Sequence, residues 1–351
     1  MKQQRKTGKR IFMDKYTKEI LELLKVAFEN AVGAHSYQTE TGARAYYLQE
    51  LNDNFYSPMS KETAAAYGTG SGNEIASGKM NALRSSSAMT YNLLGNGPVE
   101  IISSLSLDNG IHRIGGGQYR LEFEKQYPTL KAAASNRPAN LDAFLYCKET
   151  EEAVACEMKM TEWVFNKPGT LKIKYLDPAN YIDEEAGKVF VQIARELILW
   201  NDYDAQEKVC ENYPCRMARY DAFQMFKHTI ALYNACSKNE QRKIRKLTLV
   251  NCVWTLPDPN TLSKAHRDRY RFEEKCERYE FDEFRGAMRP VKKLFTDVGV
   301  DFEIEFYTFG EFLSLIKKSE EEQRYLRRYT DFTTLPVSAH NGKAADKIDV
   351  S

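Results

Sequence analysis

The sequence predicts an α/β protein in which helices flank a mixed β-sheet. Residues 141–162 predict two adjacent strands, because apolar and polar residues alternate on both sides of a polar turn. A nearly continuous apolar run at 246–256 predicts a buried strand. Residues 302–307 predict another strand, followed by a helix at 309–317. Helical patterns lie before and between these strands, an order typical of a sheet covered by helices on both faces.

The helices are predicted from apolar residues spaced three and four apart. They are expected at 16–32, 43–55, 79–94, 184–201 and 219–234, with a charged helical pair at 263–296. Residues 68–74 are expected to form a loop, since no apolar strand precedes their glycines and no Walker motif follows. Residues 111–130 predict a hairpin that turns at 115–117. Glu122 and Glu124 are expected to be solvated strand residues, with a position facing the active cleft as the alternative.

The composition predicts a protein without a membrane span and leaves nucleic-acid binding open. The 351 residues include 50 Lys and Arg against 49 Asp and Glu, so nucleic acid could be contacted only through local patches. No apolar run approaches the length of about 18 residues that suggests a membrane span, and no secretory signal is evident. The seven cysteines include no Cys-x-x-Cys pair, which favours reduced thiols in the cytoplasm, with Cys147 and Cys156 packed in the core.

No internal repeat or long linker divides the chain, which favours a single core domain. We expect that core at 70–307, with a helical N-terminal extension at 1–69. A C-terminal helix and a disordered tail are expected at 308–351. The basic residues at 1–9 predict a solvated tail, with a phosphate-contacting arm as the alternative.

Asp142, Glu157 and Lys159 are the candidate catalytic residues. A tight turn at 150–151 would place Asp142 opposite Lys159, and a register two residues different would place it opposite Glu157. Two carboxylates this close repel each other unless a cation lies between them, and oxygen ligands suit Mg²⁺ or Mn²⁺. With an ammonium group beside the cation, the set suits phosphodiester hydrolysis. A salt-bridged surface hairpin is the structural alternative.

Asp142 followed by Glu157-Met158-Lys159 on a hairpin resembles the Asp…Glu-x-Lys signature of the PD-(D/E)XK nuclease superfamily, which includes many restriction endonucleases. Leu141 stands where the superfamily often has a proline. The resemblance implies a restriction-endonuclease-like mixed β-sheet core flanked by helices. It also implies that the Asp and the Glu bind a divalent metal while the Lys assists the attacking water.

The segment before the hairpin extends this resemblance. It is similar to the helix that precedes the catalytic hairpin in a group of bacterial restriction-endonuclease-like proteins. In many members of the superfamily an acid on this helix completes the metal site, which makes Glu74 a candidate catalytic and metal-binding residue. An acid that complements the dipole at the helix start is the alternative. The residues that carry the likeness are Glu74, Lys79-Met80, Leu83-Arg84-Ser85-Ser86-Ser87-Ala88 and Asn92-Leu93.

Four further residues are candidates for substrate binding. Lys172 and Lys174 follow the hairpin and are suited to contact phosphates, with a surface hairpin as the alternative. The helix at 219–234 resembles the superfamily helix that flanks the cleft, which would bring Gln224 or Lys227 near the substrate. His228 on the same helix is expected to be an ordinary surface or packing residue.

The expected function is metal-dependent endonucleolytic cleavage of DNA by a cytoplasmic, restriction-endonuclease-like enzyme that uses Mg²⁺ or Mn²⁺. A DNA-repair, recombination or mobile-element nuclease is the alternative within the same fold. A non-catalytic nucleic-acid-binding protein is the alternative of a different class, against which the complete Asp, Glu and Lys set argues. Cutting both strands would require two active sites, so a homodimer is compatible with this expectation.

Overall fold

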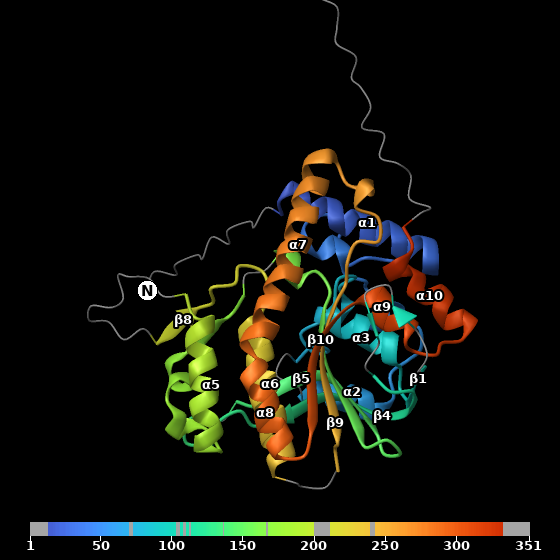
Figure 1. Ribbon diagram of the computed structural model, residues 1–351. Coiled ribbons are helices and arrows are strands. Elements are labelled where there is room, and N and C mark those ends of the chain that lie inside the picture. Colours follow the sequence, from blue (N-terminus) through green and yellow to red (C-terminus); the bar gives the residue numbers. More distant parts are fainter. Residues whose placement is uncertain are drawn as a thin grey trace, which may run out of the picture.

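The computed structural model describes residues 13–69, 73–102, 106–107, 110–111, 114–135, 137–165, 168–199, 211–238 and 243–332. Within these residues, the largest sheet is mixed and has the strand order β1-β4-β5-β6-β9-β10 (Figure 1). Antiparallel pairing joins β1 to β4, β4 to β5 and β5 to β6, whereas β6, β9 and β10 run parallel. The strands span Val99–Ile101, Gly117–Tyr127, Ala139–Cys147, Glu152–Lys159, Lys246–Val253 and Asp301–Thr308.

Two small antiparallel pairs lie outside this sheet, β2 with β3 and β7 with β8. They span Ser106–Leu107, Gly110–Ile111, Thr170–Lys172 and Asn212–Pro214. The predicted α/β class is confirmed by this arrangement of strands and helices. In the part of the chain that the structure describes, no helix combines the length and the apolar character needed to cross a bilayer.

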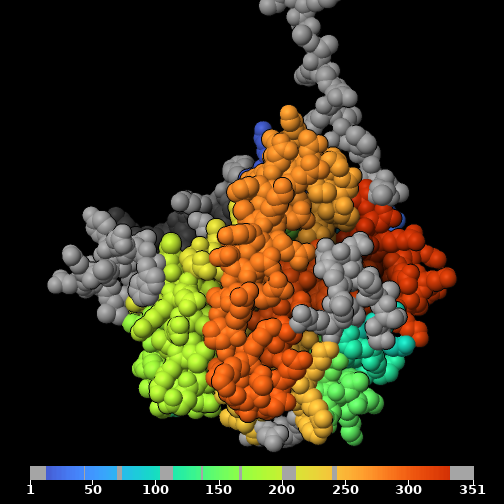
Figure 2. Space-filling view, in the orientation of Figure 1, coloured from blue at the N-terminus to red at the C-terminus, as the bar shows by residue number. Residues whose placement is uncertain are grey.

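Helical crossovers connect the parallel strands, as parallel pairing requires. One crossover leads from β6 to β9 and the next from β9 to β10. In Figure 2, the last two of their helices, coloured orange, form a continuous ridge down one face of the molecule beside α5. The crossover helices α4 to α8 span Glu162–Phe165, Glu184–Leu197, Ala222–Ser237, Lys264–Ala287 and Arg289–Asp297.

The sheet separates two apolar cores, because successive strand residues face opposite sides. In β6, Val154, Cys156 and Met158 belong to one core, whereas Ala153 and Ala155 belong to the other. The second core contains α5, α6 and α8. The first contains residues of α4 and α7 and of α1, α2, α3, α9 and α10, the last five of which span Lys15–Val32, Lys61–Thr69, Ser86–Leu94, Phe309–Ser314 and Glu320–Thr330.

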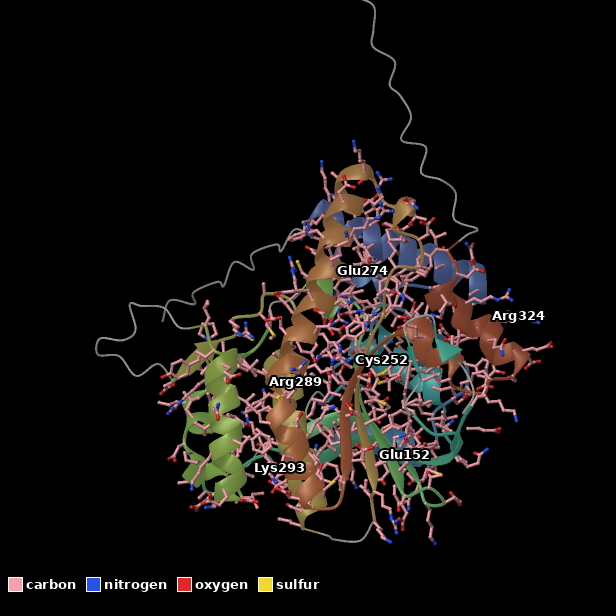
Figure 3. All side chains as sticks on the ribbon, in the orientation of Figure 1. Glu152, Cys252, Glu274, Arg289, Lys293 and Arg324 are labelled. Carbon is pink, nitrogen blue, oxygen red and sulfur yellow. The ribbon has the colours of Figure 1, made fainter. Side chains whose placement is uncertain are left out.

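The cysteines that the structure describes are free thiols. Cys147 and Cys156 are buried, which confirms their predicted place in the core. Cys252 of β9 lies at the centre of the molecule (Figure 3). The predicted tail at 1–9 and the predicted disordered end after 335 lie outside the described residues.

Two predicted helices are shorter than expected. Residues 43–55 form two 3₁₀ turns, Ala43–Tyr46 and Leu51–Asn54, instead of one helix. The buried Asn54 side chain bonds backbone carbonyls of Met80 and Ala82, so tertiary contacts hold this segment. The helix expected at 79–94 begins only after Ser85, whose hydroxyl accepts the N–H of Ala88 and caps it.

The prediction of a hairpin at 111–130 is wrong. Residues 117–127 are the single strand β4, which pairs with β1 on one side and β5 on the other. Gly115 precedes this strand, and its N–H donates to the Glu152 carboxylate at 3.0 and 3.1 Å. A side chain at Gly115 would collide with that carboxylate, so this glycine serves a close approach and not a hairpin turn. The sequence did not predict helix α2, because the apolar residues of this segment are not spaced at a clear helical period.

A buried carboxylate fastens α1 to α7 and to the start of α6. Glu273 of α7 is 1% exposed, and its oxygens lie 2.9 Å from Arg219, 3.0 Å from Arg269 and 2.8 Å from the Tyr16 hydroxyl. Removing one partner of a buried ion pair leaves the other charges uncompensated. We therefore expect Glu273→Ala to lower the free energy of unfolding by about 3 kcal/mol, measured by urea denaturation.

The matched control is an exposed ion pair on the neighbouring helix α8. Lys293, which Figure 3 labels, pairs there with Asp297 at 2.9 Å. Such a pair contributes little in water, so Asp297→Ala is expected to change the free energy of unfolding by less than about 1 kcal/mol. Equal effects of the two substitutions would contradict the structural role assigned to Glu273.

Candidate active site

Asp142 and Glu157 lie opposite each other where the paired backbone of β5 and β6 ends. The last pair is Ala143 with Cys156, so the next residues along the two strands are these two acids. Of the two predicted registers, the structure has the one with Asp142 opposite Glu157. The Asp142 carboxylate accepts the backbone N–H of Met158 at 2.7 Å, which ties it to β6.

Polar residues continue this row across the sheet. In β4, the pairs on either side of Glu124 place it opposite Asp142. In β9, Asn251 is the direct register partner of Glu157. The row therefore reads Glu124, Asp142, Glu157 and Asn251 across four neighbouring strands. It lies on the sheet face that α6 covers, the same face as Ala155 of the second core.

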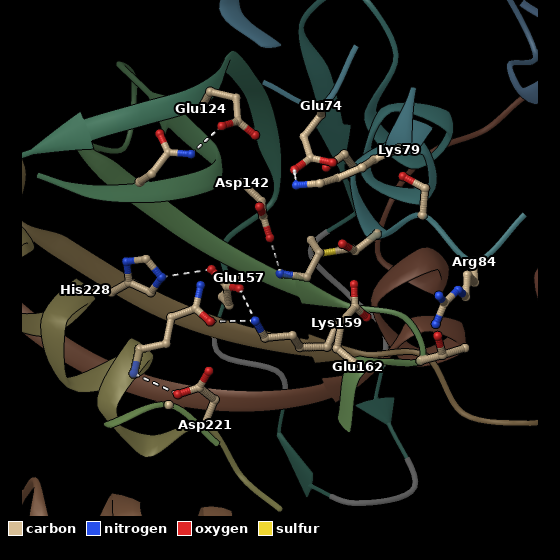
Figure 4. A pocket seen from close by; sticks show the side chains of 18 of the residues that line it. Glu74, Lys79, Arg84, Glu124, Asp142, Glu157, Lys159, Glu162, Asp221 and His228 are labelled. Atoms are coloured by element: carbon tan, nitrogen blue, oxygen red, sulfur yellow. Dashed lines mark hydrogen bonds and ion pairs between the residues drawn. The ribbon is translucent and has the colours of Figure 1, made fainter. Parts of the chain in front are cut away.

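Glu157 is fixed from both sides. It is 2% exposed, and one oxygen lies 2.7 Å from Nζ of Lys159 while the other lies 2.8 Å from Nε2 of His228 (Figure 4). The Lys159 ammonium also donates to Oε1 of Gln224 at 2.6 Å. Asp221 caps the start of α6 through the N–H of Gln224, which places Gln224 and His228 over the strand.

The two facing carboxyl groups have opposite protonation tendencies. Burial opposes ionisation of Glu157, but the charge of Lys159 and the hydrogen bond from His228 outweigh it and lower the pKa of Glu157 to about 2. Burial and the negative charge of Glu157 raise the pKa of Asp142 well above its ordinary value. Without a cation, the pair therefore favours one ionised and one protonated carboxyl group.

These side chains form one wall of a cleft of about 720 Å³. All four predicted catalytic residues line it, and so do Gln224 and Lys227. Glu74 comes from the loop before α3 and pairs with Lys79 at 3.1 Å (Figure 4). Burial lowers the pKa of Lys227, so its amine is less basic than that of an exposed lysine.

The other two predicted substrate-binding residues lie elsewhere. Lys172 is exposed and Lys174 donates to the carbonyl of Ala134 at 3.2 Å, and neither belongs to the cleft wall. Burial and the charge of Lys172 lower the pKa of Lys174. The side chain of Lys172 is therefore exposed outside the cleft, whereas the ammonium group of Lys174 is hydrogen-bonded within the protein.

Glu124 was expected to be a solvated strand residue, and this prediction is wrong. It is 9% exposed, lines the cleft, and its carboxylate accepts a hydrogen bond from the side chain of Asn140 (Figure 4). Burial raises the pKa of Glu124 to about 7, opposed by Asn140 and assisted by the charges of Glu74 and Glu157. Its φ of +51° is a strained backbone conformation for a residue with a side chain.

His228 was expected to be an ordinary surface or packing residue, and the structure corrects this as well. It is 2% exposed and bonds Glu157. Because an ionised carboxylate can only accept, Nε2 of His228 carries the proton in this bond. The sequence held one signal for it: Gln224 and His228 are four residues apart and therefore share a helix face.

The donor set fits a hard divalent cation, although it is not a preformed cage. Among the described residues, no group of three or more His, Cys, Asp or Glu side chains is already arranged to hold a metal ion. Mg²⁺ needs no such cage, because it keeps several waters and is often held by one or two carboxylates. Asp142 and Glu157 provide that pair. Burial and the negative charge of Glu157 raise the pKa of Asp142, and a cation between the two carboxylates would offset the second of these causes.

Comparison of the chain with protein-family models, with curated proteins and with solved structures finds no match. Function is therefore inferred from the geometry and chemistry of the cleft.

Proposed function

We propose that this protein is a metal-dependent nuclease that hydrolyses phosphodiester bonds of DNA. The observation that carries the proposal is the convergence of Asp142, Glu157 and Lys159 in one cleft from a single hairpin. A salt-bridged surface hairpin would leave these residues exposed, whereas Glu157 is almost completely buried. Burying two facing acids and an ammonium group is costly, which favours a functional role over a structural one.

The mixed sheet supports a restriction-endonuclease-like architecture. The acids lie on an antiparallel hairpin whose second strand, β6, pairs in parallel with β9. Helices cover both faces of the sheet. This element order agrees with the one implied by the Asp…Glu-x-Lys resemblance. The proposed assignment to the PD-(D/E)XK superfamily rests on that agreement and on the cleft residues.

Six residues of the cleft have a chemical role in this proposal. Asp142 and Glu157 would hold Mg²⁺ or Mn²⁺, with Glu74 as a third acid, and a bound metal would supply Lewis-acid activation of the phosphate. Lys159 would orient the attacking water and stabilise the charge that develops on the phosphoryl oxygens. Gln224 holds the Lys159 ammonium in place, and Lys227 would contact a neighbouring phosphate.

The test is cleavage of plasmid and single-stranded DNA by the purified protein, with Mg²⁺, with Mn²⁺ or with EDTA. We expect cutting only with metal, and its loss in Asp142→Asn and Lys159→Met. Binding of Mn²⁺ is measured in parallel by calorimetry. If the folded protein binds no Mn²⁺ and any residual cutting survives both substitutions, the proposal is wrong and a non-catalytic nucleic-acid-binding protein takes its place.

The hydrogen bond from His228 gives a further prediction. His228→Leu removes the donor that orients Glu157, and partners of this kind affect metal affinity about 10- to 100-fold. We expect a loss of Mn²⁺ affinity in that range by calorimetry. His228→Gln retains an N–H donor and is expected to lose less. Unchanged affinity in His228→Leu would show that Lys159 alone positions Glu157.

A further inference from the structure

A second, smaller cavity lies beside the cleft. Its volume is about 120 Å³, and it shares part of its wall with the cleft, including Glu157, Lys159 and Gln224. Asn251 of β9 and Glu277 of α7 belong to the smaller cavity and not to the cleft wall. Glu157, Lys159 and Gln224 therefore lie between the cleft and the smaller cavity.

Two buried polar atoms in this cavity have no partner in the described part of the chain. They are Nδ2 of Asn251 and Oε2 of Glu277, on residues that are 2% and 3% exposed. Buried polar groups in native proteins are almost always hydrogen-bonded, to protein or to ordered water. An unpaired donor and an unpaired acceptor in one cavity therefore indicate a ligand that can serve both.

Water meets this requirement better than a metal ion does. One water molecule accepts from an amide N–H and donates to a carboxyl oxygen, whereas a cation would leave Asn251 Nδ2 unpaired. Since a water molecule takes roughly 30 Å³ in the liquid, the cavity has room for a few of them.

The ammonium group of Lys159 in the cavity wall has one more N–H donor than the two bonds described for it. Lys159 carries three N–H donors and bonds Glu157 and Gln224. Burial raises the pKa of Glu277 to about 8, assisted by Glu280 and Asp221 and opposed by Lys159 and Arg219. A carboxyl group that is largely neutral near pH 7 can both donate to water and accept from it.

We propose that this cavity holds ordered water that links Glu277 and Asn251 to the ammonium group of Lys159. Glu277 is then a positioning residue that acts on Lys159 through water. The occupancy of the cavity follows from its geometry alone, whereas the effect on cleavage rests on the proposed function of Lys159.

Occupancy is tested by a crystal structure of the full chain at a resolution that shows ordered water, grown in potassium salts and again in rubidium salts. We expect water within hydrogen-bond distance of both Asn251 Nδ2 and Glu277 Oε2, with no anomalous rubidium signal. An empty cavity or a rubidium peak in it would overturn the proposal. The result of this measurement does not depend on whether the protein cuts DNA.

The positioning role is tested with three variants in the presence of Mn²⁺. Glu277→Leu removes the polar partner and is expected to lower kcat about 10-fold with little change in KM, at an unchanged or higher melting temperature. Glu277→Gln keeps the hydrogen bonds to water and is expected to restore most of kcat. The control is Glu283→Gln, at a half-exposed position of the same helix, 3.8 Å from Arg216.

Parent-like kcat in Glu277→Leu, or equal losses in Glu277→Leu and Glu277→Gln, would overturn the positioning role. A parent protein that cuts no DNA would instead overturn the proposed function. The crystal structure would still show whether the cavity holds ordered water.

Discussion

Lys159→Met is expected to slow DNA cleavage about 10²- to 10³-fold, the effect of removing one preorganised charge-stabilising donor from an active site. Methionine retains much of the length and packing of the lysine side chain, but it cannot donate to water or to a phosphoryl oxygen. Because the metal would be held by carboxylates, Mn²⁺ affinity is expected to fall much less than the rate. Single-turnover cleavage and calorimetry separate these two quantities.

The control for this variant is Lys188→Met. Lys188 lies on α5, where it forms an exposed ion pair with Glu185 at 2.6 Å. Its replacement makes the same change in net charge and is expected to leave cleavage unchanged. Lys159→Met also removes the partner of a buried acid, so circular dichroism must show that the variant is folded at the assay temperature. Equal rates for the two variants would exclude Lys159 from the reaction.

Asp142→Asn is expected to reduce metal-dependent cleavage about 10³-fold or more, because a metal supplies several kcal/mol of transition-state stabilisation and each 1.36 kcal/mol is tenfold in rate. It is also expected to raise the melting temperature in EDTA. The amide oxygen can still accept the N–H of Met158, while the uncharged amide avoids the cost of protonating or ionising a buried carboxyl group beside Glu157. Loss of activity with a gain in stability marks a residue kept for function.

The pH dependence of that gain follows from the raised pKa of Asp142. An unfolded chain ionises this group near its ordinary value of 3.8, whereas the folded protein retains the proton to higher pH. Stability from this group is therefore present at low pH and is lost as the pH rises toward the folded pKa. The advantage of Asp142→Asn over the parent should grow across this interval.

The acids and the lysine could be predicted because they lie on one local hairpin. Glu157 and Lys159 are two residues apart on a strand, so a shared face follows from backbone geometry. The register with Asp142 could not be decided from sequence, since the turn at 148–151 contains no glycine, asparagine or proline that specifies a turn type. In the structure Glu151 takes a φ of +54°, and the longer turn brings Asp142 to Glu157.

Other polar residues around the acids come from segments whose positions depend on tertiary pairing. Glu124 joins the site because β4 pairs with β5, and the alternation of residues along 117–127 does not say which strand lies beside it. Asn251 joins it because β9 inserts parallel to β6, and apolar patterning predicts such a strand without its neighbours. His228 depends on how α6 crosses the sheet. Spacing along the chain places His228 on the helix face of Gln224, but it does not say where that helix lies on the sheet.

The origin of the site in two distant parts of the chain also sets when it can exist during synthesis. The facing acids belong to one hairpin, but His228 follows Glu157 by 71 residues. At about 5–20 residues per second, a ribosome needs roughly 4–14 seconds to make that interval. During this time the acids have been synthesised without the helix that holds Glu157 and Lys159. The candidate site of a growing chain is therefore incomplete until α6 has been translated and has docked on the sheet.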